Sequence, residues 1–205
     1  MNPAPLIGVS RLRIGTDGHG ITTLVAFHGC LLRCRYCLNP QCLSTDAKVL
    51  VQSPEEIMQT LKKDELYFLS TKGGITFGGG EPLLRAGFIK EILELGAKHW
   101  HITAETSLNV PLQNVKLLFP YIHEYIVDIK DMNPCIYKAY SGCNNEIVKL
   151  NLRWLIEHGK SEHILCRIPL IPEFNTPEDQ QRSKLELEAM GITHFNLFTY
   201  RTNKK

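Results

Sequence analysis

The chain has 205 residues, of which 43% are hydrophobic and 21% charged, as in an ordinary globular protein. Lysine and arginine together number 23 against 21 acidic residues, and the net charge of +2 excludes a strong attraction to nucleic acid or to an acidic membrane. No apolar run approaches the ~20 residues that span a bilayer, and the N-terminus does not have the pattern of a secretory signal. We therefore expect a cytoplasmic protein that binds neither nucleic acid nor membrane.

Short β-rich runs alternate with helical stretches along the chain. Six such runs predict strands, at residues 21–27, 74–77, 100–105, 125–130, 164–168 and 195–198. Helices are predicted at 83–98, 110–119 and 147–156, and also after Ser53 and Thr176, which each precede a proline and a glutamate as helix caps do. The apolar faces of the first two helices are predicted to consist of Ile57, Leu61, Leu66 and Leu69, and of Phe88, Ile92 and Leu95.

This alternation, with strands that are apolar almost throughout, predicts an α/β fold in which helices cover a parallel sheet. Six strand–helix units suit either a doubly wound sheet or an incomplete barrel. The chain shows no internal repeat and no linker, so we predict a single domain over residues 1–205. Polar residues gather at the strand ends, where parallel α/β proteins bind ligands; these are Glu81, Glu105, Asp128, Lys130, Arg167 and Arg201.

Three of the seven cysteines, Cys30, Cys34 and Cys37, stand together with the spacing C-x3-C-x2-C. An odd number of cysteines in a chain expected to be cytoplasmic argues against a disulfide framework. Three thiolates suit a cubic 4Fe–4S cluster that leaves one iron open to substrate, because a structural zinc site needs four protein ligands. A zinc loop completed by His28 or Cys42 is the alternative. We expect the four cysteines outside the trio to bind no cluster.

A glycine run, Gly78-Gly79-Gly80, ends the second predicted strand and is followed by Glu81 and Pro82. Glycines allow a backbone to approach a ligand closely, so that its amides and carbonyls can bind polar groups. Alone, this pattern is better explained by a plain tight turn. The glycine run follows the cysteine trio after one predicted helix, and the two motifs together are a stronger functional signal than the glycine run alone.

Together these segments resemble the radical S-adenosylmethionine superfamily, and within it the activating enzymes of glycyl radical enzymes, such as pyruvate formate-lyase activating enzyme. The turn at residues 17–20 resembles the D-G-P-G turn of that group, with His19 in place of proline, and residues 28–42 resemble its cluster loop. The segments 128–130, 140–145 and 167–172 resemble later parts of the activators in the same order. The resemblance covers nearly the whole chain.

The resemblance implies a partial TIM-type barrel, (β/α)6, with one 4Fe–4S cluster held by Cys30, Cys34 and Cys37. It implies that the amino and carboxylate groups of S-adenosylmethionine bind the open iron, and that reductive cleavage yields a 5′-deoxyadenosyl radical. That radical would remove an α-hydrogen from a glycine of a partner glycyl radical enzyme. Flavodoxin or ferredoxin would supply the electron.

Individual binding residues follow from the same resemblance. Gly79, Gly80 and Glu81 match the motif that holds the methionine amino group, and the backbone at Tyr36 matches the position beside the adenine. The resemblance also implies that the ribose, the carboxylate or their surroundings are bound by Asp128, Lys130 and Arg167.

Glu105 stands where pyruvate formate-lyase activating enzyme has an aspartate of a monovalent-cation site, so such a cation is a possible further ligand. For Asp128 and Lys130 the alternative is a plain ion pair at a strand end, and for Arg167 it is a structural arginine.

Two departures from the family pattern leave other functions open. The activators continue beyond the last strand with a P-Y-H motif, whereas here Arg201 takes the place of the histidine and the sequence ends four residues later. The stretch between Cys42 and Gly78 has no cysteine, so the resemblance implies no auxiliary cluster. One alternative is a small radical enzyme that acts on a nucleotide-like or pterin-like metabolite. Another is a non-catalytic protein that has kept the fold.

Overall fold

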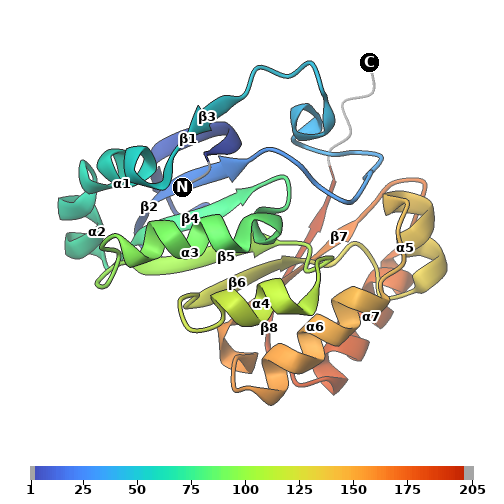
Figure 1. Ribbon diagram of the computed structural model, residues 1–205. Helices are drawn as coiled ribbons and strands as arrows, with labels where there is room; N and C mark the ends of the chain where they lie inside the picture. The colour runs from blue at the N-terminus through green and yellow to red at the C-terminus, as the bar shows by residue number, and fades with distance from the viewer. Residues whose placement is uncertain (1–2, 201–205) are drawn as a thin grey trace. The chain divides into compact units, whose positions relative to one another are not determined.

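Eight β-strands and seven α-helices form in the computed structural model, which describes residues 3–200 (Figure 1). The strand order is β3-β1-β2-β4-β5-β6-β7-β8. The described residues divide into two compact units. The first unit comprises residues 3–30, 39–106 and 113–125, and the second comprises residues 31–38, 107–112 and 126–200. Arg201, which the sequence places at the ligand-binding edge, lies outside the described residues.

In the first unit, strand β2 (Ile21–Phe27) has an antiparallel neighbour on one side and a parallel neighbour on the other. The antiparallel neighbour is β1 (Ala4–Ile14), whose outer edge pairs with β3 (Leu50–Gln52). The parallel neighbour is β4 (Gly74–Gly79), which in turn pairs with β5 (His101–Thr106). Parallel pairing brings the carboxyl ends of β2, β4 and β5 to one edge of the sheet.

The helices of the first unit are α1 (Pro54–Lys62), α2 (Glu65–Thr71) and α3 (Ala86–Glu94), and α3 lies in front of β4 and β5 in Figure 1. A capping box between Ser53 and Glu56 starts α1, as the sequence predicts. A short 3-10 helix (Pro82–Arg85) connects β4 to α3, and another (Pro40–Leu43) follows the cysteine trio. Helix α4 (Leu112–Leu118) precedes strand β6 (Glu124–Asp128).

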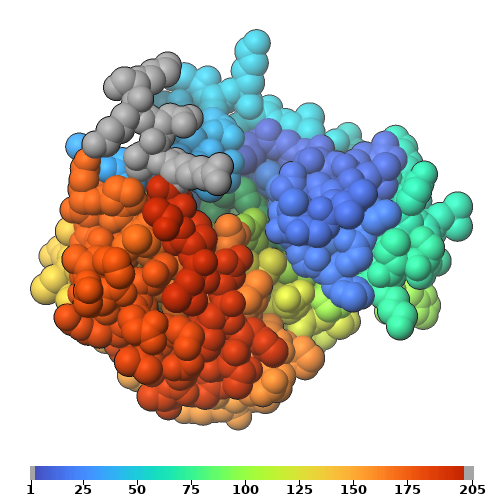
Figure 2. Space-filling model, turned by 180° about the vertical axis from the view of Figure 1, so that it is seen from behind, coloured from blue at the N-terminus to red at the C-terminus, as the bar shows by residue number. Residues whose placement is uncertain are grey.

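In the second unit, β7 (Ile164–Leu170) and β8 (His194–Thr199) pair in parallel, and β8 lies at the surface, red in Figure 2. Three helices accompany them: α5 (Pro134–Ser141), α6 (Glu146–Glu157) and α7 (Pro177–Ala189). Helices α6 and α7 lie side by side, joined by an ion pair of 2.8 Å between the Lys149 ammonium and the Glu186 carboxylate. The predicted cap at Thr176 is confirmed, since its hydroxyl accepts a hydrogen bond from the Asp179 amide.

Several expectations from the sequence need correction. The structure has eight strands instead of six, because β1 and β3 form an additional antiparallel edge, and it also contains α5. Leu66 and Leu69 are exposed by 81% and 50%, because the helix expected after Ser53 breaks into α1 and α2 at Asp64. Leu95 is exposed because α3 ends at Glu94.

None of the helices within residues 3–200 is both long and apolar enough to cross a membrane.

A buried carboxylate explains where the first helical stretch breaks. Asp64 is fully buried and accepts a hydrogen bond of 3.0 Å from Arg11 Nε on β1 and one of 2.7 Å from the Thr23 hydroxyl on β2. Burial acts to raise the pKa of Asp64, but these hydrogen bonds outweigh it and the pKa is lowered. Asp64 therefore ties the end of α1 to two strands.

Because the pKa of Asp64 is lower in the folded state than in the unfolded chain, its stabilisation is present at neutral pH and lost as the pH falls toward the folded pKa. We expect Asp64→Asn to lower the free energy of unfolding at pH 7 by about 2 kcal/mol. The variant should also lose less stability between neutral and acid pH. Urea titrations at several pH values measure both effects, with the exposed Asp46→Asn as control. An acid dependence equal to that of the unchanged chain would contradict this account.

Candidate functional site

The ends of β2 and β4 place the first part of the predicted site. Phe27 is paired with Gly79 in the parallel register, so the segments beyond them continue side by side. The Gly80 amide donates to the Phe27 carbonyl at 2.9 Å, and the Glu81 amide donates to the Gly29 carbonyl at 2.8 Å. The Gly-Gly-Glu turn is thus hydrogen-bonded to the residue directly before Cys30.

The glycines of this turn are required by the close approach of the two chains. Gly79 has φ +97°, a conformation that L side chains rarely adopt, and a Cβ there would lie 2.8 Å from the Phe27 amide nitrogen. A Cβ on Gly80 would overlap the Gly29 carbonyl oxygen. The glycine pattern therefore serves the contact between the turn and the start of the cluster loop (residues 28–42).

The Glu81 side chain is turned into the protein. It is 1% exposed, and its Oε1 accepts hydrogen bonds from the Thr106 hydroxyl at 2.6 Å and from the Leu83 amide at 3.2 Å. The carboxylate therefore caps the 3-10 helix Pro82–Arg85 and joins the turn to the end of β5. Asn39 adds a further tie, because its Nδ2 donates to the Gly79 carbonyl at 3.0 Å.

Glu105, predicted near a monovalent cation, lies at the end of β5 beside β4. A Cβ built on Gly78 would lie 3.2 Å from its Oε2. The hydrogen bond to Asp17 raises the pKa of Arg13 and burial lowers it, and the Glu105 carboxylate makes a smaller contribution that raises it. The guanidinium of Arg13 on β1 therefore interacts electrostatically with Glu105. The monovalent cation expected at Glu105 remains a prediction.

The cysteine trio is divided between the two units, with Cys30 in the first and Cys34 and Cys37 in the second. Within the second unit, the loop 31–38 is held by the end of α5. The Arg33 amide donates to the Ser141 carbonyl at 2.8 Å, and the Arg35 amide donates to the Tyr140 carbonyl at 3.1 Å. These bonds give a physical role to the segment 140–145, whose pattern resembles the activators.

Tyr36 reaches the segment that follows β7. Its hydroxyl donates to Glu173 Oε2 at 3.0 Å, and its ring centroid lies 5.9 Å from that of Phe174 and 6.2 Å from that of Tyr140. The hydrogen bond to Glu173 raises the pKa of Tyr36. Glu173 itself has φ +71°, which is uncommon for a residue other than glycine. The loop 31–38 is therefore fastened by contacts with two distant segments.

Asp128, the last residue of β6, lies between Lys130 just beyond it and Arg167 in the middle of β7, so the expected position of Arg167 at a strand end is wrong. Lys130 Nζ lies 3.2 Å from Asp128 Oδ2, and Arg167 Nε lies 3.5 Å from Asp128 Oδ1. Burial acts to lower the pKa of Lys130, but Asp128 and further neighbours, Cys34 among them, raise it well above its usual value. A protonated Lys130 therefore faces the thiol of Cys34, whose pKa is raised by burial and lowered by this ammonium.

The trio fits an iron–sulfur cluster by its donor chemistry. The three sulfurs form no disulfide, and a nearby ammonium can balance part of the negative charge that thiolates and sulfide would bring. In the described part of the chain, no three histidine, cysteine or acidic side chains converge as ligands of one metal ion. In a cubic cluster each thiolate binds a different iron, whereas a structural zinc site needs four protein ligands on one ion.

Three of the four cysteines outside the trio have contacts or burial that the structure describes. Cys42 is buried, and its carbonyl accepts a hydrogen bond of 2.9 Å from the Gly29 amide. His28, the other candidate zinc ligand, has its Nε2 3.0 Å from the Ser44 carbonyl. Cys143 lies at the end of α5, with its sulfur 3.6 Å from the Leu31 carbonyl. Cys166 is a buried core residue, and burial raises its pKa to about 12.

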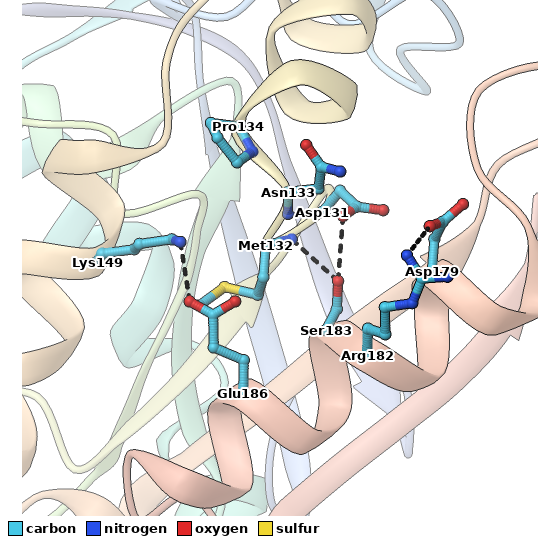
Figure 3. Close-up of a pocket in the computed structure, with 9 residues that line it drawn as sticks. All are labelled: Asp131, Met132, Asn133, Pro134, Lys149, Asp179, Arg182, Ser183 and Glu186. Atoms are coloured by element: carbon cyan, nitrogen blue, oxygen red, sulfur yellow. Dashed lines mark hydrogen bonds and ion pairs between the residues drawn. The ribbon is translucent and has the colours of Figure 1, made fainter.

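A polar cavity of about 290 Å³ lies in the second unit between the start of α5 and helices α6 and α7 (Figure 3). Its charges are paired among themselves, Lys149 with Glu186 and Arg182 with Asp179. The Ser183 hydroxyl accepts from the Met132 amide at 2.9 Å and donates to the buried Asp131 at 3.2 Å. The hydrogen bonds of Ser183 therefore hold the segment that follows β6, the strand that ends at Asp128.

Sequence reasoning missed several supporting residues. Asn39, Ser141, Glu173 and Asn145 act through contacts with residues distant in the chain. Asn145, for example, donates from Nδ2 to the carbonyls of Asp131 at 3.2 Å and Met132 at 2.9 Å. Ser141 and Asn145 belong to the 140–145 pattern and Asn39 to the segment 28–42, and these patterns were the available signals.

Comparisons with known proteins identify the family of the chain. The pattern of the Radical SAM superfamily matches residues 24–180. The "(2S)-3-sulfopropanediol dehydratase activating enzyme" of Klebsiella oxytoca is 35% identical, over 85% of this chain and 74% of that protein. The "Indoleacetate decarboxylase activating enzyme" of Tractidigestivibacter scatoligenes is 28% identical, over 80% of this chain and 72% of that protein.

Among solved structures, SuiB of Streptococcus suis, bound to the precursor peptide SuiA, has a TM-score of 0.66 at 16% identity. The match covers 94% of this chain and 40% of that one, and it shows a shared fold. The predicted α/β fold class is therefore confirmed. The chain belongs to the Radical SAM superfamily.

The contact between the turn and the cluster loop can be tested through its glycines. We expect Gly80→Ala to displace the Gly29 carbonyl, and so to reduce both the thermal stability and the iron content after anaerobic reconstitution. Gly87→Ala on α3 is the matched control, because nothing lies within 4 Å of a Cβ there. The account is wrong if both variants bind as much iron as the unchanged chain.

Proposed function

We propose that this chain is an activating enzyme of a glycyl radical enzyme. In this reaction S-adenosylmethionine is cleaved reductively at a 4Fe–4S cluster, and a glycine α-hydrogen is removed from the partner protein. Support comes from the superfamily match and from relatives that are named activating enzymes. Those relatives carry the names of different target enzymes, so we assign the class of partner and not one member of it.

The observation that carries the proposal is the joining of the cluster loop to the Gly-Gly-Glu turn. The carbonyls of Phe27 and Gly29 accept from the amides of Gly80 and Glu81, directly before Cys30. We infer that Cys30, Cys34 and Cys37 hold the cluster, which supplies one-electron reduction and an open iron when it is bound. The chain's own task is then to position the cofactor's methionine end at the adjacent turn.

The turn offers its backbone for that task. Because the Glu81 carboxylate is buried and bound to Thr106 and Leu83, it fixes the conformation of the turn. We assign the polar backbone of Gly79, Gly80 and Glu81 to the methionine amino group. In this proposal Glu81 acts on cofactor affinity through the shape of the turn.

The second unit supplies the charges for the rest of the cofactor. We assign Lys130, Asp128 and Arg167 to the carboxylate and ribose, because they form a charged group around the end of β6. The backbone at Tyr36 is assigned to the adenine, in a loop that Glu173 holds in place. A cation at Glu105 is part of the same proposal.

The remaining parts of the proposal concern the setting of the reaction. We propose that residues 1–205 act together as one functional domain in the cytoplasm, without nucleic acid or membrane as partners. A flavodoxin or ferredoxin would deliver the electron that each cleavage consumes. The substrate would be a glycine-containing segment of a folded protein, which must leave its own fold to react, so we expect a transient complex.

The first test is cofactor chemistry without any protein partner. Anaerobically reconstituted protein should bind about four irons per chain. With dithionite it should convert S-adenosylmethionine to 5′-deoxyadenosine and methionine, which chromatography quantifies. About eight irons per chain would contradict a single cluster, and a reduced cluster that leaves S-adenosylmethionine intact would reject the proposed function.

The role of the turn is tested in the same preparation. Glu81→Ala should keep the visible spectrum of the cluster but weaken S-adenosylmethionine binding by about tenfold or more, since the turn loses the bonds to Thr106 and Leu83. Glu162→Ala, at an exposed acidic residue, should bind the cofactor like the unchanged chain. Equal affinity in both variants would remove Glu81 from the site.

A further inference from the structure

We propose that Glu173 is a positioning residue for S-adenosylmethionine, held in a strained backbone conformation from which its carboxylate fixes Tyr36. This inference rests on the proposed function, because it takes the backbone at Tyr36 as the part of the chain beside the adenine. Glu173 then acts on the cofactor through Tyr36 and is not itself a catalytic residue.

Glu173 lies in a backbone conformation that does not suit its residue type. Its φ of +71° is in the left-handed region, where a side chain crowds the backbone and glycine is favoured. Three other described residues besides glycine have a positive φ, namely Leu12, Lys72 and Leu108. Among these four described residues, Glu173 is the one whose side chain forms a hydrogen bond. A strained residue that makes a specific contact points to a function for that contact.

The strain originates in the turn that follows β7. The carbonyl of Ile171 accepts hydrogen bonds of 3.1 Å from the amides of both Phe174 and Asn175, so the chain reverses direction within residues 171–175. The Asn175 side chain closes the same turn, since its Oδ1 accepts from the Ile171 amide at 2.6 Å. Glycine would adopt the required conformation without strain. The turn alone therefore does not account for a glutamate at the position of Glu173.

The side chain of Glu173 restrains a second turn, which carries two of the predicted cluster ligands. Tyr36 lies between Cys34 and Cys37, and the Cys37 amide donates a hydrogen bond of 3.2 Å to the Cys34 carbonyl. The Tyr36 hydroxyl donates to Glu173 Oε2 at 3.0 Å, and its ring meets that of Phe174 edge-on with the centroids 5.9 Å apart. Two adjacent residues of the turn after β7 thus hold the Tyr36 side chain. The backbone that we assign to the adenine is fixed with it.

The turn after β7 also holds the charged residues assigned to the cofactor. Asn175 Nδ2 donates to Asp131 Oδ2 at 3.0 Å, and the buried Asp131 directly follows Lys130 in the chain. One turn therefore connects the loop beside the adenine with the segment that carries Asp128 and Lys130. A site that is ordered before binding loses less conformational entropy when the cofactor arrives.

The test measures stability and affinity on the same variants of the reconstituted protein. Glu173→Gly removes both the strain and the hydrogen bond to Tyr36. Its thermal midpoint should therefore not fall, whereas its Kd for S-adenosylmethionine should rise about threefold or more. Glu173→Gln keeps an acceptor for the Tyr36 hydroxyl and should bind the cofactor almost as the unchanged chain does. Isothermal titration of the oxidised protein measures the Kd, and calorimetric melting measures stability.

Two further variants separate the hydrogen bond from the strain. Tyr36→Phe removes only the hydroxyl, and its effect on the Kd should not add to that of Glu173→Gly, because both changes break the same contact. Lys72→Gly is the matched control, since it relieves a φ of +56° at the end of α2 and should leave the Kd unchanged without loss of stability. With dithionite as reductant, Glu173→Gly should raise the KM for S-adenosylmethionine and leave kcat unchanged.

Two results would overturn this role of Glu173. A Kd for Glu173→Gly equal to that of Lys72→Gly would remove Glu173 from the cofactor site. A loss of stability that accompanies the loss of affinity would make Glu173 a structural residue only. Both results come from oxidised protein and leave the proposed function standing, which fails by a different observation: the cofactor binds with the expected differences in Kd, but the reduced cluster does not cleave it.

Discussion

Two backbone hydrogen bonds at the end of a parallel strand pair determine how the site is arranged. Phe27 is paired with Gly79, so the chain that leaves β2 and the chain that leaves β4 run together beyond the sheet. The amides of Gly80 and Glu81 then bind the carbonyls that precede Cys30. This approach leaves no room for side chains, and it explains why a glycine run follows the strand.

The other part of the cluster loop depends on side chains and helix ends of the second unit. The loop 31–38 is bound to the last residues of α5 and, through Tyr36, to Glu173. The charged group of Asp128, Lys130 and Arg167 lies around the end of β6, and its ammonium is near enough to Cys34 to stabilise thiolate charge. A motif of three cysteines thus needs support from segments far along the chain.

The sequence was sufficient for features that depend on local patterns. The positions of β2, β4, β5, β6, β7 and β8 follow from β-rich runs, and the caps at Ser53 and Thr176 are local motifs. The cysteine spacing and the glycine run indicated the site for the same reason. The resemblance of the later segments pointed to residues whose contacts are now visible, such as Ser141 with Arg33.

Features that depend on distant partners were not predictable. Asp64 breaks the first helical stretch because it binds Arg11, 53 residues away. Leu66 and Leu69 therefore belong to a second helix, α2. Strand β1 was missed because its antiparallel pairing is interrupted by register shifts and only two of its 11 residues are buried. The Tyr36–Glu173 bond spans 137 residues, and the two side chains carry no local signal of their pairing.

The central claim is that this chain removes a glycine α-hydrogen from a partner protein and leaves a glycine-centred radical there. Electron paramagnetic resonance tests this claim most directly. The reduced, reconstituted protein and S-adenosylmethionine are incubated with candidate glycyl radical enzymes from the same genome. The account predicts a glycine-centred radical in one of them, which disappears when its reactive glycine is replaced by alanine. A preparation that cleaves S-adenosylmethionine and converts a small metabolite, yet forms no glycine radical with any candidate, would contradict it.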